Sequence, residues 1–473
     1  MILNRFLLIA FACAFVHAEA QNASTSKPNI IYILADDLGY GDLGCYGQTK
    51  IPTPNIDALA AGGILFTDHY AGSTVCAPSR ATILTGLHTG HVSVRGNREV
   101  QPEGQAPLLK SEPNLIALMK KAGYSTGLFG KWGLGYPGSV SDPMAMGFDV
   151  FFGYNCQRRA HAYYPDYLWS NDQKVDLSAN NGAQTATYSP IVIQEAALDF
   201  IENHAKKPFF MFYASTLPHA ELAAPSDEIA EFSGIFGKES PYPGQPDPMK
   251  RKNGSYGGQT EPRAAYAAMV SHLDKQVGDI MARVEALGIA ENTIIIFSSD
   301  NGPSNEGGGD PNFFDSNGKL RGTKRDLSEG GIRVPFIANW PGTIEAGSQS
   351  DHLSAQWDML ATFCDLVGVA PTAGDGLSFK PLFLGKPAPE HEFLYWEFTP
   401  GTPAKAVRMG DWKAIITYTA QNPEGELALY NLRTDLGEQD DLSGANPEIV
   451  EQLKAIIAQE HIESKDFPFP NEQ

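Results

Sequence analysis

The sequence predicts an α/β protein with a large mixed, mostly parallel sheet layered by helices, followed by a smaller C-terminal antiparallel sheet with one helix. Continuous apolar runs at 28–34, 208–213 and 293–297 have the pattern of strands that are buried on both faces. Segments with helical periodicity, such as 189–203 and 262–287, lie between them. Strands that alternate with helices in this way favour a sheet covered by helices.

The chain changes character after Gly376. Short runs with strand character are then separated by turns, and the last helical pattern is amphipathic. These elements fall at 393–398, 405–409, 412–417 and 427–432 for the strands and at 447–463 for the helix. We therefore expect a main domain over 28–375 and a C-terminal subdomain over 376–473.

Composition and charge exclude several classes of protein. The 473-residue chain is 42% hydrophobic and 19% charged, which is ordinary for a globular protein. Its formal net charge is −20 at pH 7, which argues against nucleic acid or an anionic membrane surface as a partner.

Residues 1–20 have the pattern of a secretory signal peptide, with a basic start, an apolar core over 6–16 and an A-x-A cleavage site at 18–20. The apolar core is too short to span a bilayer, and no other stretch is long enough. We therefore predict an exported protein, periplasmic or secreted, without a membrane span. Once Cys13 has left with the signal, four cysteines remain, which is not a disulfide framework.

Charged and polar side chains follow the predicted strands at several places far apart in the chain. Ligands gather at the carboxyl ends of parallel strands, so we expect these side chains to converge on one edge of the sheet. The residues concerned are Asp36, Asp37, Lys131, His219, Asp300 and Asn301.

The adjacent carboxylates Asp36 and Asp37 have two interpretations, a solvated turn or helix cap and a pair of ligands for a hard divalent cation. With Asp300 and Asn301 they would offer four oxygen donors, three of them anionic. Such a set suits Ca²⁺, with Mg²⁺ as the alternative that dehydrates less readily. Zn²⁺ prefers His and Cys ligands, which are not grouped in this sequence.

The stretch 75–86 has the pattern of a loop that turns into a helix, with Cys76 at its start. Pro78 suits a first helical turn, where backbone N–H groups and the helix dipole also favour an anion. Arg80 adds a fixed positive charge about one turn further on. Taken alone, this pattern is also that of an ordinary structural or redox-active cysteine.

The pattern C-x-P-S-R, continued by A-x-x-x-T-G, resembles the signature of the type I, formylglycine-dependent sulfatases of the alkaline phosphatase superfamily. The chain resembles secreted bacterial carbohydrate sulfatases and arylsulfatases over nearly all of its mature length. The resemblance implies that Cys76 is oxidised after translation to formylglycine (3-oxoalanine) by a formylglycine-generating maturation enzyme. The hydrated aldehyde would then attack the sulfur of a sulfate ester.

The resemblance also implies roles for the charged residues of the predicted edge. The residues that would bind calcium are Asp36, Asp37, Cys76, Asp300 and Asn301. The residues that would support the formylglycine or bind the sulfate group are Arg80, Lys131, His219 and Lys324. Because the net charge of the chain is negative, these basic residues must make the local electrostatic potential at the site positive enough to attract a sulfate group.

One position departs from the family pattern. Many members read G-K-W-H-L-G, whereas this chain reads G-K-W-G-L-G over 130–135, so the histidine is replaced by Gly133. The hydrogen bond from that histidine to the nucleophile is therefore missing. Gln157 and His161, in an aromatic-rich segment, are candidates to fill the space and bind substrate. Core packing is the alternative interpretation of this segment.

The sequence thus favours hydrolysis of sulfate esters on a sulfated polysaccharide or oligosaccharide. The first alternative is a phosphoesterase or phosphonate hydrolase of the same superfamily, which more often uses Thr or Ser where this chain has Cys76. The second is a non-catalytic protein that binds sulfated glycans.

Overall fold

The computed structural model describes residues 27–180, 185–245 and 256–472. The signal peptide expected over 1–20 lies outside these residues. Within the described ranges, no helix is both long enough and apolar enough to cross a membrane.

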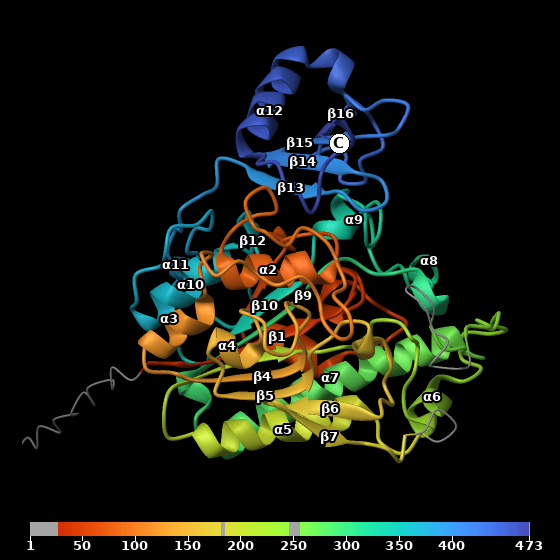
Figure 1. Cartoon of the computed structure of the whole chain (residues 1–473), viewed down its shortest axis with the longest axis vertical. Helices are drawn as coiled ribbons and strands as arrows, with labels where there is room; N and C mark the ends of the chain where they lie inside the picture. Colours follow the sequence, from red (N-terminus) through yellow and green to blue (C-terminus); the bar gives the residue numbers. More distant parts are fainter. Residues whose placement is uncertain (1–26, 181–184, 246–255, 473) are drawn as a thin grey trace, which may run out of the picture.

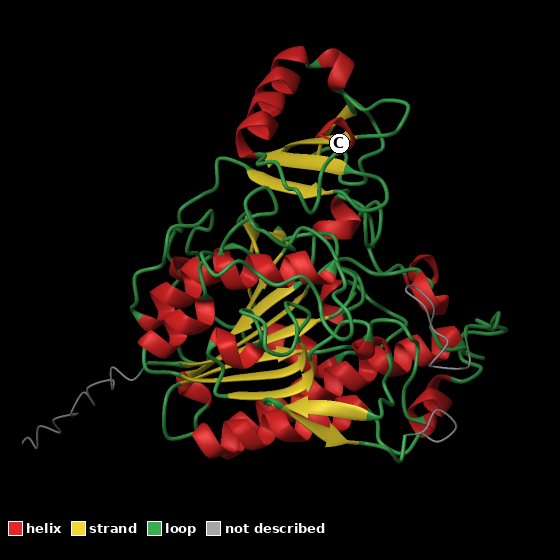
Figure 2. Ribbon diagram, in the orientation of Figure 1, coloured by secondary structure: helices red, strands yellow, loops and turns green. Residues whose placement is uncertain are grey.

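A mixed sheet of ten strands forms the centre of the main domain (Figures 1 and 2). The strand order is β11-β2-β10-β9-β1-β8-β4-β5-β6-β7. Strands β9, β1, β8, β4 and β5 run parallel, whereas β10, β6 and β7 pair antiparallel with their neighbours. The prediction of a large, mixed and mostly parallel sheet is therefore confirmed. The strands are β1 (Asn29–Ala35), β2 (Ile64–Phe66), β4 (Ser125–Lys131), β5 (Val150–Tyr154), β6 (Tyr167–Ser170), β7 (Gln173–Asp176), β8 (Phe209–Ala214), β9 (Thr293–Ser299), β10 (Phe336–Asn339) and β11 (Ser348–Ser350).

The central strand β1 shows why the sequence of this sheet lacks polar alternation. All seven of its residues are buried. Ile30, Tyr32 and Leu34 pack into the core on one face, and Ile31 and Ile33 pack into the core on the other. Successive side chains of a strand point to opposite faces, so a strand covered on both sides is apolar throughout.

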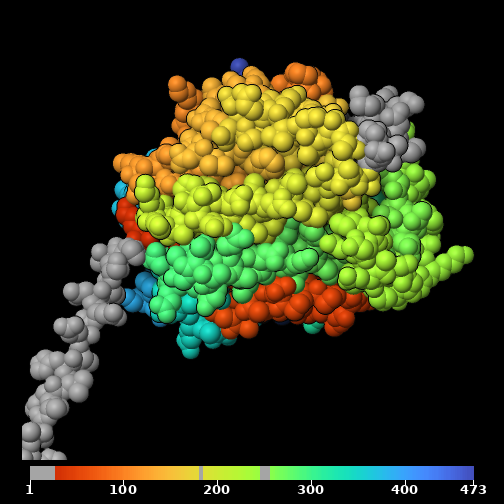
Figure 3. All heavy atoms as spheres, turned by 90° about the horizontal axis from the view of Figure 1, so that it is seen from below, coloured from red at the N-terminus to blue at the C-terminus, as the bar shows by residue number. Residues whose placement is uncertain are grey.

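Helices cover both faces of the sheet. α2, α3 and α10 contribute to one core, and α1, α5 and α7 contribute to the other. Figure 3 looks onto the second face, where the green band that includes α7 lies between the yellow-green band of α5 and the red band of the N-terminal segment. The helices of the main domain are α1 (Pro54–Ala61), α2 (Cys76–Thr85), α3 (Leu115–Lys121), α4 (Pro143–Met146), α5 (Ser189–His204), α6 (Ser226–Phe232), α7 (Pro262–Ala286), α8 (Pro311–Phe314), α9 (Glu329–Ile332), α10 (Asp358–Val367) and α11 (Lys380–Phe383).

A side-chain cap explains where α3 begins but not where α1 begins. α3 starts at Leu115, because the Asn114 side chain accepts hydrogen bonds from two backbone N–H groups of the first turn. Thr53 precedes α1, but its side chain makes no capping hydrogen bond. The Thr53 hydroxyl donates instead to the carboxylate of Asp57.

The C-terminal subdomain is a four-stranded antiparallel sheet with one helix against it, as predicted, and it stands above the main domain in Figure 1. Its boundary near residue 376 stays a prediction. Phe379 and Phe383 pack in the core of the main domain, and the four-stranded sheet begins at Leu394. Its elements are β13 (Leu394–Phe398), β14 (Ala404–Met409), β15 (Trp412–Thr417), β16 (Glu426–Asn431) and α12 (Pro447–Glu460). A further short parallel pair joins β3 (His69–Tyr70) and β12 (Ser354–Ala355) in the main domain.

Candidate active site

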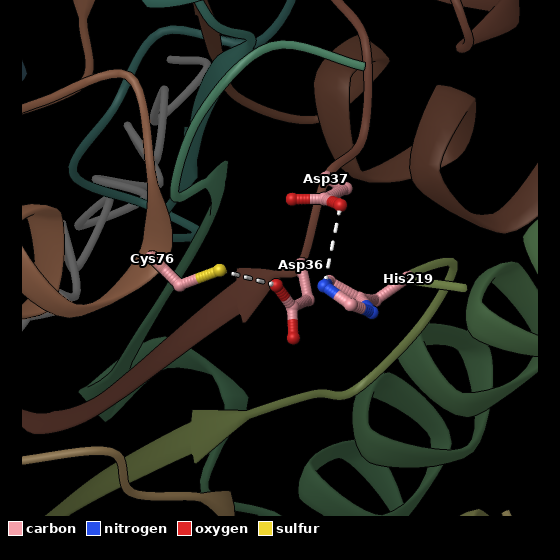
Figure 4. Close-up of side chains that lie close together, drawn as sticks. All are labelled: Asp36, Asp37, Cys76 and His219. Atoms are coloured by element: carbon pink, nitrogen blue, oxygen red, sulfur yellow. Dashed lines mark hydrogen bonds and ion pairs between the residues drawn. The ribbon is translucent and has the colours of Figure 1, made fainter. Parts of the chain in front are cut away.

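Cys76 is the first residue of α2, and all ten residues of this helix are buried. Val75 is extended (φ −147°, ψ 162°), so the chain changes from loop to helix at the cysteine, as expected. The Cys76 thiol lies 3.3 Å from Oδ1 of Asp36 and donates a hydrogen bond to it (Figure 4). Burial and the Asp36 carboxylate raise the pKa of this thiol.

Two neighbouring strands bring the acidic residues together. The register of β1 on β9 places Ala35 opposite Ser299, so Asp36 and Asp300 follow at adjacent positions. The backbone N–H of Asp300 donates to the carbonyl of Ala35 at 3.0 Å. Asp37 has a left-handed backbone (φ 64°), and its N–H donates to Oδ1 of Asp300 at 3.2 Å. The predicted convergence of strand ends is therefore present.

Two lysines neutralise two of these carboxylates. Nζ of Lys131 lies 2.6 Å from Oδ2 of Asp36, and Nζ of Lys324 lies 2.7 Å from Oδ2 of Asp37. Burial alone would raise the pKa of Asp36, but Lys131 and other cations hold it well below its usual range. Burial would lower the pKa of both lysines, but the carboxylates raise it above the ordinary value. Asp36 and Lys131 therefore form an ionised pair, and Lys324 keeps its positive charge.

Arg80 neutralises the third carboxylate. Its Nε and Nη2 atoms donate to Oδ2 of Asp300 at 3.2 and 2.9 Å, and its Nη1 donates to the carbonyl of Lys131 at 2.6 Å. Nη2 also lies 3.8 Å from Asp36. Burial and the Asp36 carboxylate raise the pKa of Asp300 in spite of Arg80. Asp300 is thus the acidic group that would gain most from additional positive charge.

His219 lies beside Asp37 and Lys324, 3.5 Å from the Asp37 carboxylate (Figure 4). Its Nδ1 contacts the carbonyl of Ala220, and Nζ of Lys324 donates to its Nε2 at 3.1 Å. Burial and Lys324 lower the pKa of His219, so the ring is neutral with its proton on Nδ1. The ring of His161 stacks on it, with centroids 4.5 Å apart and planes 17° apart. Burial and His219 lower the pKa of His161 as well.

The donor set fits a hard divalent cation. Oδ1 of Asn301 is buried and has no hydrogen-bond partner among the described residues, although its Nδ2 donates to Asp37 at 2.8 Å. A buried amide oxygen without a partner is costly unless a cation or another donor meets it. Ligand atoms within 4.8 Å of one another come from Asp36, Asp37, Cys76 and His219. Oxygen donors with three carboxylates among them are the ligands that Ca²⁺ prefers.

Gln157 fills the space beside Gly133. A Cβ atom built on Gly133 would lie 2.7 Å from both Cγ and Nε2 of Gln157, and the backbone of Gly133 is left-handed (φ 83°). A histidine at position 133 would therefore collide with the Gln157 side chain. The side-chain Nε2 of Gln157 is buried and has no partner among the described residues. Of the two candidates for this space, Gln157 is the one that contacts Gly133.

A second layer of residues around Lys324 was not expected from the sequence. The Tyr256 hydroxyl donates to Oε2 of Glu306 at 2.8 Å, and Arg325 donates to Oε1 at 2.7 Å. Oε2 of Glu306 lies 4.0 Å from Nζ of Lys324. Tyr256 also contacts His161, with ring centroids 5.4 Å apart. The only signal in the sequence was the position of Glu306, a few residues after the Asp-Asn pair, in a glycine-rich loop.

The structure thus brings together most of the residues singled out in the sequence. They are Asp36, Asp37, Cys76, Arg80, Lys131, His219, Asp300, Asn301 and Lys324. Lys131 is the last residue of β4 and not the first after it. His161 joins the group through its stacking on His219. Among the described residues, Gln157 has no hydrogen bond to the others and is placed by its contact with Gly133.

Comparison with known proteins gives a consistent picture over the whole chain. Residues 28–369 match the family model described as Sulfatase, and residues 322–463 match the one described as N-sulphoglucosamine sulphohydrolase, C-terminal. The dog N-acetylgalactosamine-6-sulfatase is 31% identical over 506 residues, which cover 97% of this chain and 89% of that protein. The N-acetylgalactosamine-6-O-sulfatase of Bacteroides thetaiotaomicron is 28% identical over 92% of this chain and 93% of its own.

A solved structure shows the same architecture. The crystal structure of Ps i-CgsB in complex with k-i-k-neocarrahexaose superposes with a TM-score of 0.76 and 27% sequence identity. The match covers 92% of each chain.

Proposed function

This chain belongs to the sulfatase family and is a sulfuric ester hydrolase, and we propose that it removes O-sulfate groups from a polysaccharide or oligosaccharide. We further propose that it uses a formylglycine at position 76 and a bound calcium ion, and that it is exported to the periplasm or secreted. The observation that supports this best is the buried group of carboxylates and cations around the Cys76 side chain.

The charges of this group suit an anionic ester. Three carboxylates and three basic side chains are paired, so the group is balanced by itself. A divalent cation among the carboxylates would leave it positive by two charges. A sulfate ester is an anion, so it would be attracted to the site although the whole chain is strongly acidic.

A carbohydrate substrate is supported by the relatives. The dog and Bacteroides proteins are described as acting on N-acetylgalactosamine sulfates, and Ps i-CgsB was solved with an oligosaccharide. The ring of His161, which stacks on His219 and is partly exposed, also offers an aromatic contact for a sugar ring.

Cys76 is unsuited to attack in its thiol form, because it is buried and donates its proton towards Asp36. Conversion to the aldehyde adds one oxygen, releases the sulfur as sulfide and removes two electrons, which an oxidant such as dioxygen must accept in the maturation enzyme. When formed, the hydrated aldehyde would supply a hydroxyl nucleophile. Because all of α2 is buried, the maturation enzyme must meet this segment before folding is complete.

The residues around position 76 would then have different roles in the reaction. Lys131 and Lys324 would offer N–H donors to the non-bridging oxygens of the sulfate group, where charge develops in the transition state. Arg80 would hold Asp300 and stabilise the residue at position 76. His219, with Nε2 facing Lys324, would contact the ester oxygen. A calcium ion held by Asp36, Asp37, Asp300 and Asn301 would supply positive charge to a sulfate oxygen.

The test is desulfation of a panel of sulfated galactans and glycosaminoglycan oligosaccharides, with analysis of the products. A small aryl sulfate and the matching aryl phosphate complete the panel. We expect release of sulfate from at least one glycan, slow or absent release of phosphate, and no turnover by Cys76→Ala. Cys364→Ala, at a buried cysteine of α10 in the main core, is the matched control and should keep its activity. Hydrolysis of the phosphate ester alone would contradict the proposal.

A further inference from the structure

Burial changes sharply between two consecutive residues beside the candidate active site, Lys324 and Arg325. Lys324 is 8% exposed and points to Asp37, whereas the side chain of Arg325 is 52% exposed. Arg325 is therefore a cation at the rim of the site proposed above.

The backbone of Arg325 is fixed against the loop that carries the nucleophile. Its N–H donates to the carbonyl of Thr74 at 3.1 Å, and Thr74 lies two residues before Cys76. The N–H of Lys324 donates to the carbonyl of Pro303 at 2.9 Å. Arg325 has a left-handed backbone (φ 79°), which is uncommon for a residue with a side chain and carries a cost that the surrounding contacts must offset.

The carboxylate of Glu306 orients the guanidinium of Arg325. Its Nη1 donates to Oε1 of Glu306 at 2.7 Å, and the other oxygen of Glu306 accepts from Tyr256 at 2.8 Å. Glu306 is only 19% exposed, so this carboxylate is held on the protein side of the guanidinium. The remaining N–H groups of Arg325 have no hydrogen-bond partner among the described residues, and the side chain is half exposed.

The rings of His161 and Tyr256 link this cation to the inner residues. His161 stacks on His219, and Tyr256 contacts both histidine rings, at 5.4 and 6.0 Å between centroids. Glu306 pairs with Arg325 and also lies 4.0 Å from Nζ of Lys324, so a sugar whose sulfate reaches Lys324 would lie close to Arg325.

We propose that Arg325, oriented by Glu306, binds a second anionic group on the substrate, either a further sulfate or a uronate carboxylate. The inference rests on the proposed function, because it assumes that a sulfated sugar occupies the inner site. A guanidinium offers a planar fork of donors that matches both anions, which a lysine does not. Arg325 therefore determines specificity for sugars that carry more than one acidic group.

The test compares kcat/KM for matched oligosaccharides. One substrate has a single sulfate, a second adds another sulfate, a third adds a uronate carboxylate, and a small aryl sulfate has neither. We expect the wild type to prefer one of the doubly anionic sugars. In Arg325→Gln the ratio of kcat/KM between that sugar and the aryl sulfate should fall by about ten- to hundredfold, mainly through KM. Arg325→Lys should recover only part of this ratio.

The matched control is Arg433→Gln, at an arginine of the C-terminal subdomain that is 76% exposed and paired with Asp411. This variant should leave every ratio of kcat/KM between two substrates unchanged. The inference is overturned if the wild type shows no preference for a second anion, or if Arg325→Gln lowers kcat/KM for all substrates by one factor. Those outcomes leave the proposed function intact, whereas a wild type that releases no sulfate from any substrate contradicts the proposed function itself.

Discussion

Substitution of Asp300 tests two properties of the site separately: its stability without metal and its binding of the proposed calcium ion. It accepts two hydrogen bonds from Arg80 and one from the backbone of Asp37, and neither Arg80 nor Asp300 is more than 1% exposed. Asp300→Ala would leave the guanidinium of Arg80 buried, with the Lys131 carbonyl and a distant Asp36 as its remaining partners. Removing one partner of a buried ion pair costs about 3–5 kcal/mol.

The measurement is the free energy of unfolding in urea, in the presence of a calcium chelator. We expect Asp300→Ala to lose about 3–5 kcal/mol relative to the wild type. The control is Asp411→Ala, which removes the same kind of partner from Arg433 in an exposed pair. A surface pair contributes roughly 0–1 kcal/mol, so this variant should be nearly as stable as the wild type.

The second part of this prediction concerns stabilisation of the folded protein by calcium. If the ion binds the folded site, the wild type should gain about 2.7 kcal/mol when calcium is at about one hundred times its dissociation constant. Asp300→Ala should gain almost nothing and should be inactive. A variant that unfolds like the wild type and is stabilised by calcium to the same extent would refute the assignment of Asp300 to the metal site.

Four further outcomes are expected. In active protein, peptide mass spectrometry should find residue 76 without sulfur and with a carbonyl oxygen in its place, and activity should scale with that fraction; full turnover with only intact Cys76 would refute the mechanism. Gln157→Ala should lower kcat by about ten- to hundredfold with little change in the unfolding midpoint, because it removes a buried donor from the site. His161→Ala should impair turnover more than folding, and a lower melting temperature with unchanged kinetics would favour the core-packing interpretation. The hydrogen bond to Asp375 raises the pKa of His91. The pair therefore contributes stability that is complete below about pH 6.5, the unfolded pKa of histidine, and that is lost as the pH rises through the folded pKa. The free energy of unfolding of the wild type should decline for this reason between about pH 6 and 8, and His91→Gln should flatten that decline.

The sequence was most informative where buried strands end in charged residues. The apolar run before Asp36 and the one before Asp300 predicted neighbouring parallel strands, and their register brings the two carboxylates together. This worked because a strand buried on both faces has an unambiguous sequence, and because parallel strands place their carboxyl ends on one edge. The motif around Cys76 likewise predicted a loop that turns into a helix.

Contacts between distant loops could not be predicted in the same way. Gly133 and Gln157 are 24 positions apart; the sequence offered both Gln157 and His161 for the space at Gly133, and the structure shows that Gln157 contacts it. The Glu306–Arg325 pair depends on the path of a glycine-rich loop, which has no apolar periodicity from which its position could be inferred. Short loop contacts of this kind are set by tertiary packing and not by local propensity.

The C-terminal subdomain has a physical connection to the inner site through buried charges. Lys413 of β15 is fully buried and contacts Glu329 at 2.8 Å and Glu438 at 3.0 Å. Glu329 begins α9, the helix that follows Lys324 and Arg325 in the chain, and it also accepts from Tyr70 at 2.6 Å. A buried carboxylate that loses its cation is costly, so the docking of the subdomain and the position of α9 depend on each other. The smaller sheet therefore helps to hold the segment that positions Lys324 beside Asp37 and His219 in the candidate active site.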